Sequence, residues 1–375
     1  ESVYPIPRGV SYNAYVLLDE KTVLLDTVDK SISDQFFENL EHVLDGRPLD
    51  YLIVNHMEPD HCAVLQDLVL RYPEVKIVCN AKTVTMIRNF FTFDIDSRAV
   101  IVKEMDTLTT GRHTFAFVMA PMVHWPEAMV SYDATTKTLF SADAFGTFGA
   151  LNGNLYADEV NFKTEYLADA RRYYTNIVGK YGAQVQALLK KASALEIKTV
   201  CPLHGPVLTG GALAEALRLY DLWSRWQSES PDDILLAHAS IHGNTARAAE
   251  LLKQKLEAKG TRVTLCDLTT TEVSYAVANA FYCGKLVLAC STYDGGLFPP
   301  MEEFLSHLQA KGFRSRTVGL IENGSWAPAA ARLMRAKLEE MKDLRVCGTV
   351  VSLRSALSPV SEAQMDALTT ELCAE

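Results

Sequence analysis

The stretch Val54-Asn55-His56-Met57-Glu58-Pro59-Asp60-His61 places four metal-capable side chains within six residues, directly after the apolar run Tyr51–Val54. Two imidazoles and two carboxylates crowded so closely would repel one another or lose their hydration without a cation between them. The stretch therefore predicts a metal site at the end of a strand. Chance clustering of surface polar residues is the alternative, and the density of ligands disfavours it.

Three further metal-capable side chains follow other short apolar segments. Each lies just beyond a run with the length and the residue types of a strand: His124 after Thr114–Met119, Asp143 after Thr138–Ser141 and His204 after Lys198–Cys201. Loops at the edge of a sheet are where binding residues concentrate. The four strand ends therefore predict one site built from four loops.

The candidate ligands are too many for one ion, namely His56, Glu58, Asp60, His61, His124, Asp143 and His204. Two ions with three terminal ligands each, and one carboxylate that bridges them, match this set. By order along the chain, we expect His56, Glu58 and His124 to hold one ion. We expect Asp60, His61 and His204 to hold the other, with Asp143 as the bridge. For His124 or His204 considered alone, a surface histidine is an equally good interpretation.

The ligand types bear on the identity of the metal. Hydrolytic zinc pairs commonly have a histidine where this chain has Glu58, and zinc has no redox chemistry. A hard carboxylate in place of an imidazole favours iron or manganese.

Length and composition limit the possible functions. A chain of 375 residues predicts two domains, and 48% hydrophobic with 22% charged residues is typical of a soluble globular protein. The net charge of −10 argues against nucleic acid as a partner, and no apolar run is long enough to span a membrane. Eight cysteines without a C-x-x-C pair indicate reduced thiols in a cytoplasm. The chain does not begin with Met, which fits either a trimmed product or a missing N-terminal piece.

The pattern changes after a polar stretch at Gln227–Asp233, which predicts a linker between domains 1–228 and 233–375. From Ile234 onward, five strand-like segments alternate with helical ones. This alternation predicts a doubly wound parallel sheet.

Three loops of this second domain predict bound FMN. The first follows the strand Ile234–Ala239 and is rich in small, hydroxyl-bearing and glycine residues, as a phosphate-binding turn at a helix N-terminus requires. Neither G-x-x-x-x-G-K-[ST] nor G-x-G-x-x-G is present, and a loop without lysine suits a monophosphate. The other two loops follow the third and fourth strands, at the switch point of such a sheet, and each offers one aromatic ring. The predicted flavin contacts are Ser240, His242, Gly243, Asn244, Thr245, Ser291, Thr292, Tyr293, Asp294, Gly295, Asn323, Gly324, Ser325 and Trp326.

Over essentially its whole length the chain resembles the flavodiiron proteins, or A-type flavoproteins. The resemblance rests on the H-x-E-x-D-H box at His56–His61, the segments Pro121–Pro126, Phe140–Gly146 and Pro202–Gly205, and the flavodoxin-type loops. It implies an α/β fold: a metallo-β-lactamase-like αββα sandwich with two non-haem iron ions, followed by a flavodoxin-like five-stranded parallel sheet with FMN.

The resemblance also implies reduction of dioxygen to water, of nitric oxide to nitrous oxide, or both, which would protect an anaerobic or microaerobic cell. An external donor such as rubredoxin would supply electrons, and a head-to-tail homodimer or a tetramer would bring the FMN of one subunit near the iron of another. Tyr173 and Tyr174 are candidates to donate a proton or hydrogen bond to the gas, with core packing as the alternative for at least one of them.

The chain departs from the family pattern in two places. His242 stands where Tyr or Phe is common, and Glu127-Ala128 stand where Asp-Ser is common. Neither departure is expected to touch a ligand position. Two other functions stay open on the sequence: a dizinc hydrolase with an appended flavodoxin domain, and a redox or gas sensor without turnover.

Overall fold

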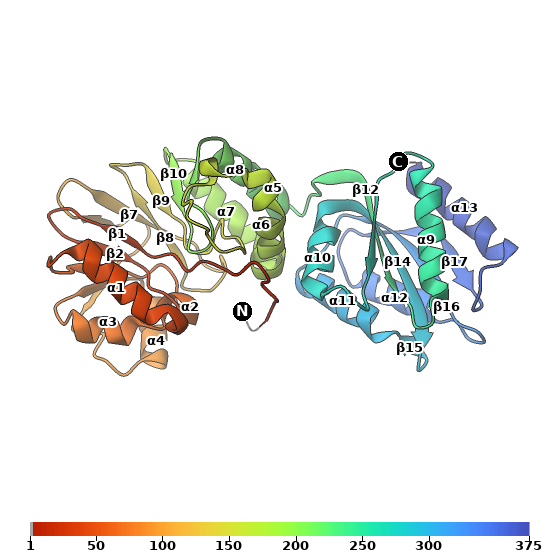
Figure 1. Ribbon diagram of the computed structural model, residues 1–375, viewed down its shortest axis with the longest axis horizontal. Coiled ribbons are helices and arrows are strands. Elements are labelled where there is room, and N and C mark those ends of the chain that lie inside the picture. The colour runs from red at the N-terminus through yellow and green to blue at the C-terminus, as the bar shows by residue number, and fades with distance from the viewer. Residues whose placement is uncertain (1–2, 375) are drawn as a thin grey trace. The chain divides into compact units, whose positions relative to one another are not determined.

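The computed structural model describes residues 3–374, which form two compact units (Figure 1). The first unit spans Ile6–Asp221 and the second begins at Leu222. The domain limits expected from the sequence, 1–228 and 233–375, stay a prediction.

Two sheets stacked face to face form the first unit. The first sheet has the order β1-β2-β3-β4-β5, with β1 Tyr15–Leu17, β2 Val23–Leu25, β3 Tyr51–Ile53, β4 Lys76–Cys79 and β5 Ala99–Ile101. The second has the order β11-β10-β9-β8-β7-β6, with β6 Thr107–Thr109, β7 Thr114–Met119, β8 Met129–Asp133, β9 Thr138–Phe140, β10 Thr199–Cys201 and β11 Leu208–Thr209.

Alternation along the buried strands places one side-chain set on each face of the first sheet. Leu24, Leu52 and Ile77 pack with Phe36 and other residues of the outer helices. Their neighbours, such as Val23, Ile53 and Val78, pack against Phe115, Phe117 and Met129 of the second sheet. The two sheets therefore share one core, as in a sandwich.

Helices cover the outer faces of both sheets (Figure 1). The helices that follow strands of the first sheet are α1 Ser33–Leu44, α2 Pro59–Cys62, α3 Leu65–Arg71 and α4 Ala81–Phe90. Those on the side of the second sheet are α5 Phe162–Glu165, α6 Leu167–Tyr173, α7 Gly182–Ala192 and α8 Gly210–Ser224. The predicted αββα sandwich is confirmed.

The second unit is a parallel sheet with helices on both faces. Its strands run in the order β13-β12-β14-β16-β17, with the short β15 antiparallel to β14. The elements are β12 Ser230–Ala239, α9 Asn244–Glu257, β13 Val263–Asp267, α10 Val273–Tyr282, β14 Cys283–Tyr293, β15 Gly296–Leu297, α11 Pro299–Ala310, β16 Thr317–Asn323, α12 Ala330–Glu339, β17 Arg345–Leu353 and α13 Pro359–Cys373. Helices α9 and α13 cover one face, and α10, α11 and α12 the other (Figure 1). The predicted five-stranded doubly wound sheet is confirmed.

One prediction about local structure is wrong. Part of the polar stretch predicted as a linker belongs to β12, because Ser230 pairs with Cys283 of β14 and the register then shifts before Ile234. Gly284 permits this close approach, since a Cβ there would lie 2.0 Å from the Pro231 carbonyl oxygen. The helical stretch that ends with α7 is interrupted by a π-helical turn at Tyr174–Val178 and a 3₁₀ turn at Gly179–Tyr181.

Arg316 fastens the start of the second unit to its sheet. The side chain is buried, and its guanidinium donates to the carbonyl oxygens of Trp226, Phe281 and Cys283 at 2.7, 2.9 and 2.7 Å. Burial lowers the pKa of Arg316 to about 10, so it remains charged at neutral pH.

Replacement of Arg316 by Met is expected to destabilise the second unit by about 3 kcal/mol, because two buried carbonyl groups and a partly buried one lose a charged donor. Denaturant unfolding followed by circular dichroism measures the change. Arg332→Met, on the exposed surface of α12, is the matched control and should cost less than about 0.5 kcal/mol. Equal midpoints for the two variants would contradict the anchoring role of Arg316.

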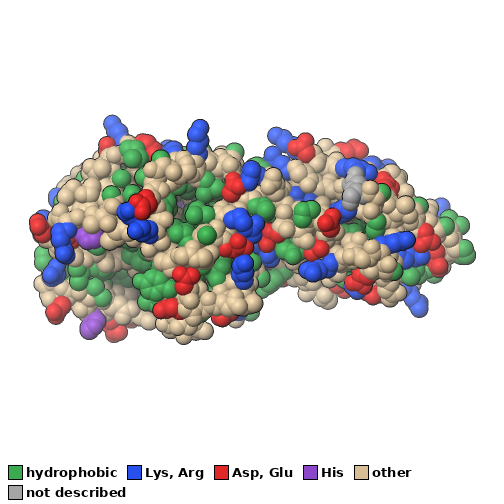
Figure 2. All heavy atoms as spheres, turned by 90° about the horizontal axis from the view of Figure 1, so that it is seen from above, with side chains coloured by type: hydrophobic (Ala, Val, Ile, Leu, Met, Phe, Trp, Pro, Cys, Tyr) green, Lys and Arg blue, Asp and Glu red, His purple; other side chains and the backbone are tan. Residues whose placement is uncertain are grey.

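Among the described residues, no helix combines the length and the apolarity needed to cross a membrane. On the face seen in Figure 2, Lys and Arg side chains are interspersed with Asp and Glu side chains. This face does not present the clustered positive charge that nucleic-acid binding requires. All eight cysteines are reduced thiols, and all but Cys373 are buried.

Candidate functional site

The His56–His61 loop changes direction within the predicted metal box. It leaves β3 in extended form, and Glu58 is the N-cap of α2, with Pro59 as the first helical residue. Proline is favoured there because that position needs no N–H donor. His56 and Glu58 therefore precede the helix, whereas Asp60 and His61 lie in its first turn, and one short segment can serve two ions.

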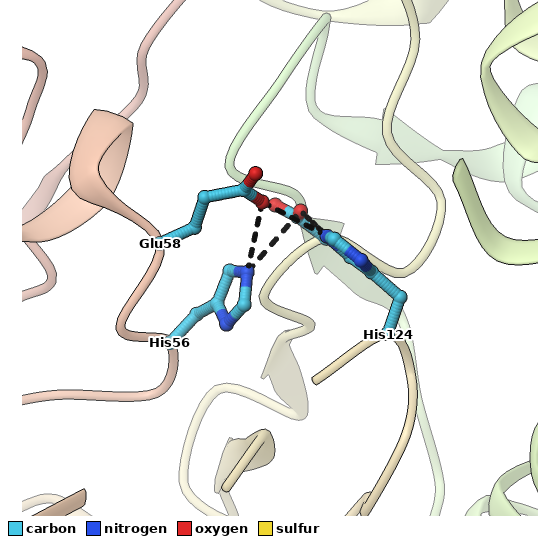
Figure 3. Close-up of side chains that lie close together, drawn as sticks. His56, Glu58 and His124 are labelled. Atoms are coloured by element: carbon cyan, nitrogen blue, oxygen red, sulfur yellow. Dashed lines mark hydrogen bonds and ion pairs between the residues drawn. The ribbon is translucent and has the colours of Figure 1, made fainter. Parts of the chain in front are cut away.

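The first ligand cluster comprises His56, Glu58, His124 and Asp143, whose ligand atoms lie within 4.8 Å of one another. His124 Nε2 is 3.0 Å from both Glu58 Oε2 and Asp143 Oδ2. His56 Nε2 is 3.4 Å from Glu58 Oε2 and 3.5 Å from Asp143 Oδ2. Figure 3 shows His56 and Glu58, which come from one loop, and His124, which comes from another, pointing toward one another.

The second ligand cluster comprises Asp60, His61 and His204. The Nε2 atoms of the two histidines are 3.1 Å apart, and each is 3.4 Å from Asp60 Oδ2. The structure thus brings together the two triads predicted from chain order. Their roles as ligands remain a prediction.

Asp143 lies between the two clusters. Its Oδ2 atom faces His124 and His56, whereas its Oδ1 atom is 3.2 Å from His61 Nε2 and 3.7 Å from His204 Nε2. One carboxylate oxygen therefore points to each triad, as the expected bridge requires. Buried Oδ1 atoms of Asp143 and Asp60 have no hydrogen-bond partner among the described residues. Orphaned oxygens that converge with imidazole nitrogens fit a pair of metal ions.

The pKa values of Asp143, His124 and Glu58 are shifted in the directions expected for a cluster of paired charges. Burial alone would raise the pKa of Asp143, but the nearby imidazoles of His56 and His61 hold it well below its usual range. Burial would lower the pKa of His124, yet hydrogen bonds to Asp143 and Glu58 raise it to about 8. The pKa of Glu58 is lowered to about 2, because its hydrogen bonds to His124 and His56 outweigh burial. Protons on these histidines balance the carboxylates in the way that cations would, so metal binding should release protons.

Residues behind the ligands were not predicted from the sequence. At the end of β2, Asp26 accepts hydrogen bonds from the backbone N–H groups of Asn55 and His56 at 2.7 and 3.1 Å, and Thr27 Oγ1 donates to the His61 carbonyl at 2.7 Å. Asp26 directly follows a strand, as Asp143 nearly does, so the strand-end rule could have found it.

The expectation that Glu127 touches no ligand position is wrong. Its Oε1 atom is 2.8 Å from His56 Nδ1 and also accepts the Met57 N–H at 2.9 Å. The two residues are 71 positions apart, and no spacing rule connects them. The other departure, His242, lies in the second unit, where it lines a cavity at the ends of the sheet strands.

The two candidate tyrosines occupy different surroundings. Tyr173 is buried, and its ring centroid is 5.5 Å from that of His204. Tyr174 is fully buried with its ring 5.0 Å from that of Tyr220, which supports core packing for this residue.

A cavity of about 610 Å³ opens at the carboxyl ends of β12, β14 and β16. Thirteen of the fourteen predicted flavin contacts line it. Gly243 is not among the lining residues: it is the N-cap of α9 with φ +88°, and it shapes the turn. Its contact with the flavin stays a prediction. Ile241, Ala327 and Ser355 also line the cavity and were missed. Ser355 follows β17, the last strand of the sheet in chain order, and the prediction from three loops did not include the end of this strand.

Hydrogen bonds join the three loops beneath this cavity. Thr245 Oγ1 lies 2.8 Å from Ser291 Oγ and accepts from Asn323 Nδ2 at 3.3 Å. Thr245→Val keeps the shape and removes both bonds, so we expect the dissociation constant for FMN to rise about tenfold. Quenching of flavin fluorescence measures it. Thr264→Val, on the exposed face of β13, is the control, and an equal effect in both variants would contradict the bracing role of Thr245.

Residues 10–205, just over half of the chain, match the model of the ODP family beta lactamase. The chain belongs to this family. The match covers all seven predicted ligand positions, and the last of them, His204, lies near its end.

Known proteins resemble the chain beyond the span of the family model. The anaerobic nitric oxide reductase flavorubredoxin of Escherichia coli O1:K1 is 28% identical over 343 residues, which are 90% of this chain and 70% of that protein. The rubredoxin oxygen:oxidoreductase of Desulfovibrio gigas shares the fold with a TM-score of 0.92, at 24% identity over 98% of this chain and 91% of its own. The flavodiiron protein of Giardia intestinalis does so with a TM-score of 0.90, at 23% identity over 100% and 92%. The resemblance to flavodiiron proteins is therefore confirmed.

Proposed function

We propose that the chain reduces dioxygen to water, nitric oxide to nitrous oxide, or both, with FMN and a diiron centre as cofactors. The observation that carries this proposal is Asp143, which presents one oxygen to each of two ligand triads in a chain that also has a flavin cavity. The names of the relatives support the reaction class, since they are an anaerobic nitric oxide reductase and an oxygen oxidoreductase. The chain is accordingly an oxidoreductase.

When bound, FMN and iron supply the electrons and the Lewis acidity of the reaction. The protein contributes the seven ligands in a largely buried setting, which limits the access of water. Burial, together with the charges of Asp143 and Glu58, raises the pKa of Tyr173 well above its usual value. Tyr173 therefore keeps its phenolic proton and can donate a hydrogen bond beside His204.

The remaining parts of the proposal concern partners and place. A rubredoxin-type donor is supported by the names of the two relatives. Tyr293 and Trp326, at the rim of the flavin cavity, are 44% and 87% exposed, and exposed aromatic rings suit a surface that another subunit covers. We therefore include a head-to-tail dimer or tetramer, in the cytoplasm of an anaerobic or microaerobic cell.

Metal and flavin analysis followed by gas consumption tests this function. The purified protein should contain two irons and one FMN per chain, and with reduced rubredoxin it should consume dioxygen or nitric oxide repeatedly. Measurement of both gases on one preparation assigns the preference. Zinc without iron would favour the dizinc hydrolase, and a single stoichiometric uptake of gas would favour the sensor.

A further inference from the structure

The two ligand clusters have the same kinds of ligand but differ in the groups that contact the Nδ1 atoms of their histidines. Each combines two histidines with one carboxylate, Glu58 or Asp60, and shares Asp143. Behind the first cluster, His56 Nδ1 faces the Glu127 carboxylate at 2.8 Å. Behind the second, His204 Nδ1 donates to the neutral backbone carbonyl of Ser11 at 2.7 Å. His61 Nδ1 has no partner among the described residues.

Glu127 is fixed in this position by several contacts. Its side chain is buried, and its Oε1 atom accepts from both His56 Nδ1 and the Met57 N–H. Its backbone carbonyl accepts from Asn80 Nδ2 at 2.6 Å, and the Asn80 side chain also caps α4. The acceptor behind His56 is therefore held rigidly between two elements of the first unit.

We propose that Glu127 is a positioning residue that makes the two metal ions inequivalent, an inference that rests on the proposed diiron site. A carboxylate at Nδ1 holds the proton there and directs the lone pair of His56 Nε2 toward the metal. Its negative charge also makes the imidazole a stronger donor. The ion held by His56, Glu58 and His124 is then bound more tightly than its neighbour, and its ferric state is stabilised relative to the neighbour's.

Glu127→Gln separates this role from simple support of the loop. A glutamine oxygen can accept the same two hydrogen bonds, so the variant removes the charge and keeps the contacts. Asp26→Asn is the matched control, because it neutralises a buried carboxylate that holds the backbone of Asn55 and His56 without touching a ring nitrogen.

The test is anaerobic loading with ferrous iron, followed by a chelator titration of iron per chain. The wild type should lose its two irons in separate steps. In Glu127→Gln the tighter step should weaken 10- to 100-fold, the typical effect of losing such an outer partner. The reduction potential of that one iron should rise. Asp26→Asn should leave the separation of the two steps intact, and denaturant unfolding followed by circular dichroism checks that the first unit of each variant folds.

The inference fails if Glu127→Gln keeps both the wild-type steps and the wild-type potentials, or if Asp26→Asn weakens the same single step. Should Glu127→Gln not fold, Glu127→Asp keeps the charge but shortens the side chain, and it should weaken the same step to a smaller degree. Should the wild type take up no iron, the proposed function fails instead. The same titration with zinc then tests Glu127 by affinity alone.

Discussion

Asp143→Ala is expected to give a protein that binds FMN but retains neither iron and reduces neither gas above background. The carboxylate oxygens of Asp143 face different triads, so its removal takes one ligand from each ion and leaves four histidines close together. The flavin cavity is built from other residues in the second unit. Iron analysis, the visible flavin spectrum and steady-state gas consumption check the three parts of this result.

Asp143→Asn refines this experiment. It preserves the size of the side chain but replaces one oxygen with an amide nitrogen, which cannot bind a metal, so most of the iron should again be lost. Asp158→Ala, at an exposed position of the same unit, is the control and should retain two irons. Two retained irons in Asp143→Ala would remove this residue from the bridging role.

The sequence was sufficient to predict which metal-capable side chains come together, because each lies just beyond a strand. The loop His56–His61 follows β3 of the first sheet, and His124, Asp143 and His204 follow strands of the second. Binding residues concentrate in such loops, where His and Asp are recognisable from the sequence. The same rule predicted the flavin loops, since small polar residues lie at or next to the ends of β12, β14 and β16. The sequence could therefore predict the residues of each site that directly follow a strand.

The contacts behind the candidate ligands could not be inferred in this way. Glu127 reaches His56 only because the second sheet stacks on the first. The hydrophobic pattern of the strands does not reveal which residues of the two sheets this stacking brings together. Strand β8 at Met129–Asp133 is buried along its whole length, so it lacks the alternation that reveals a half-exposed strand. The role of Gly284 in the pairing of Ser230 with Cys283 likewise becomes visible only once the Pro231 carbonyl is known to lie against it.

Gly205→Ala is expected to destabilise the first unit by about 3 kcal/mol and to release the ion of the second cluster. Gly205 has φ +85°, and a Cβ at this position would lie 2.2 Å from Thr147 Cγ2. Thr147 is buried, so the turn must shift instead. That turn carries His204 and is held by Ser11 and Asn13, whose side chains bond to the Gly205 N–H and carbonyl. Denaturant unfolding and iron content per chain measure the two effects.

Two further variants separate the clash from the strained backbone angle. Gly260 has φ +87° and nothing within 4 Å of an added Cβ, so Gly260→Ala should cost only about 1 kcal/mol and retain both irons. Thr147→Ser removes the methyl group at 2.2 Å and leaves Thr147 Cβ, at 3.4 Å, as the next nearest atom. Combined with Gly205→Ala it should therefore restore the second iron while the cost of the angle remains. If the double variant stayed as poor in iron as Gly205→Ala alone, the position of His204 would depend on the backbone angle and not on the space that glycine leaves beside Thr147.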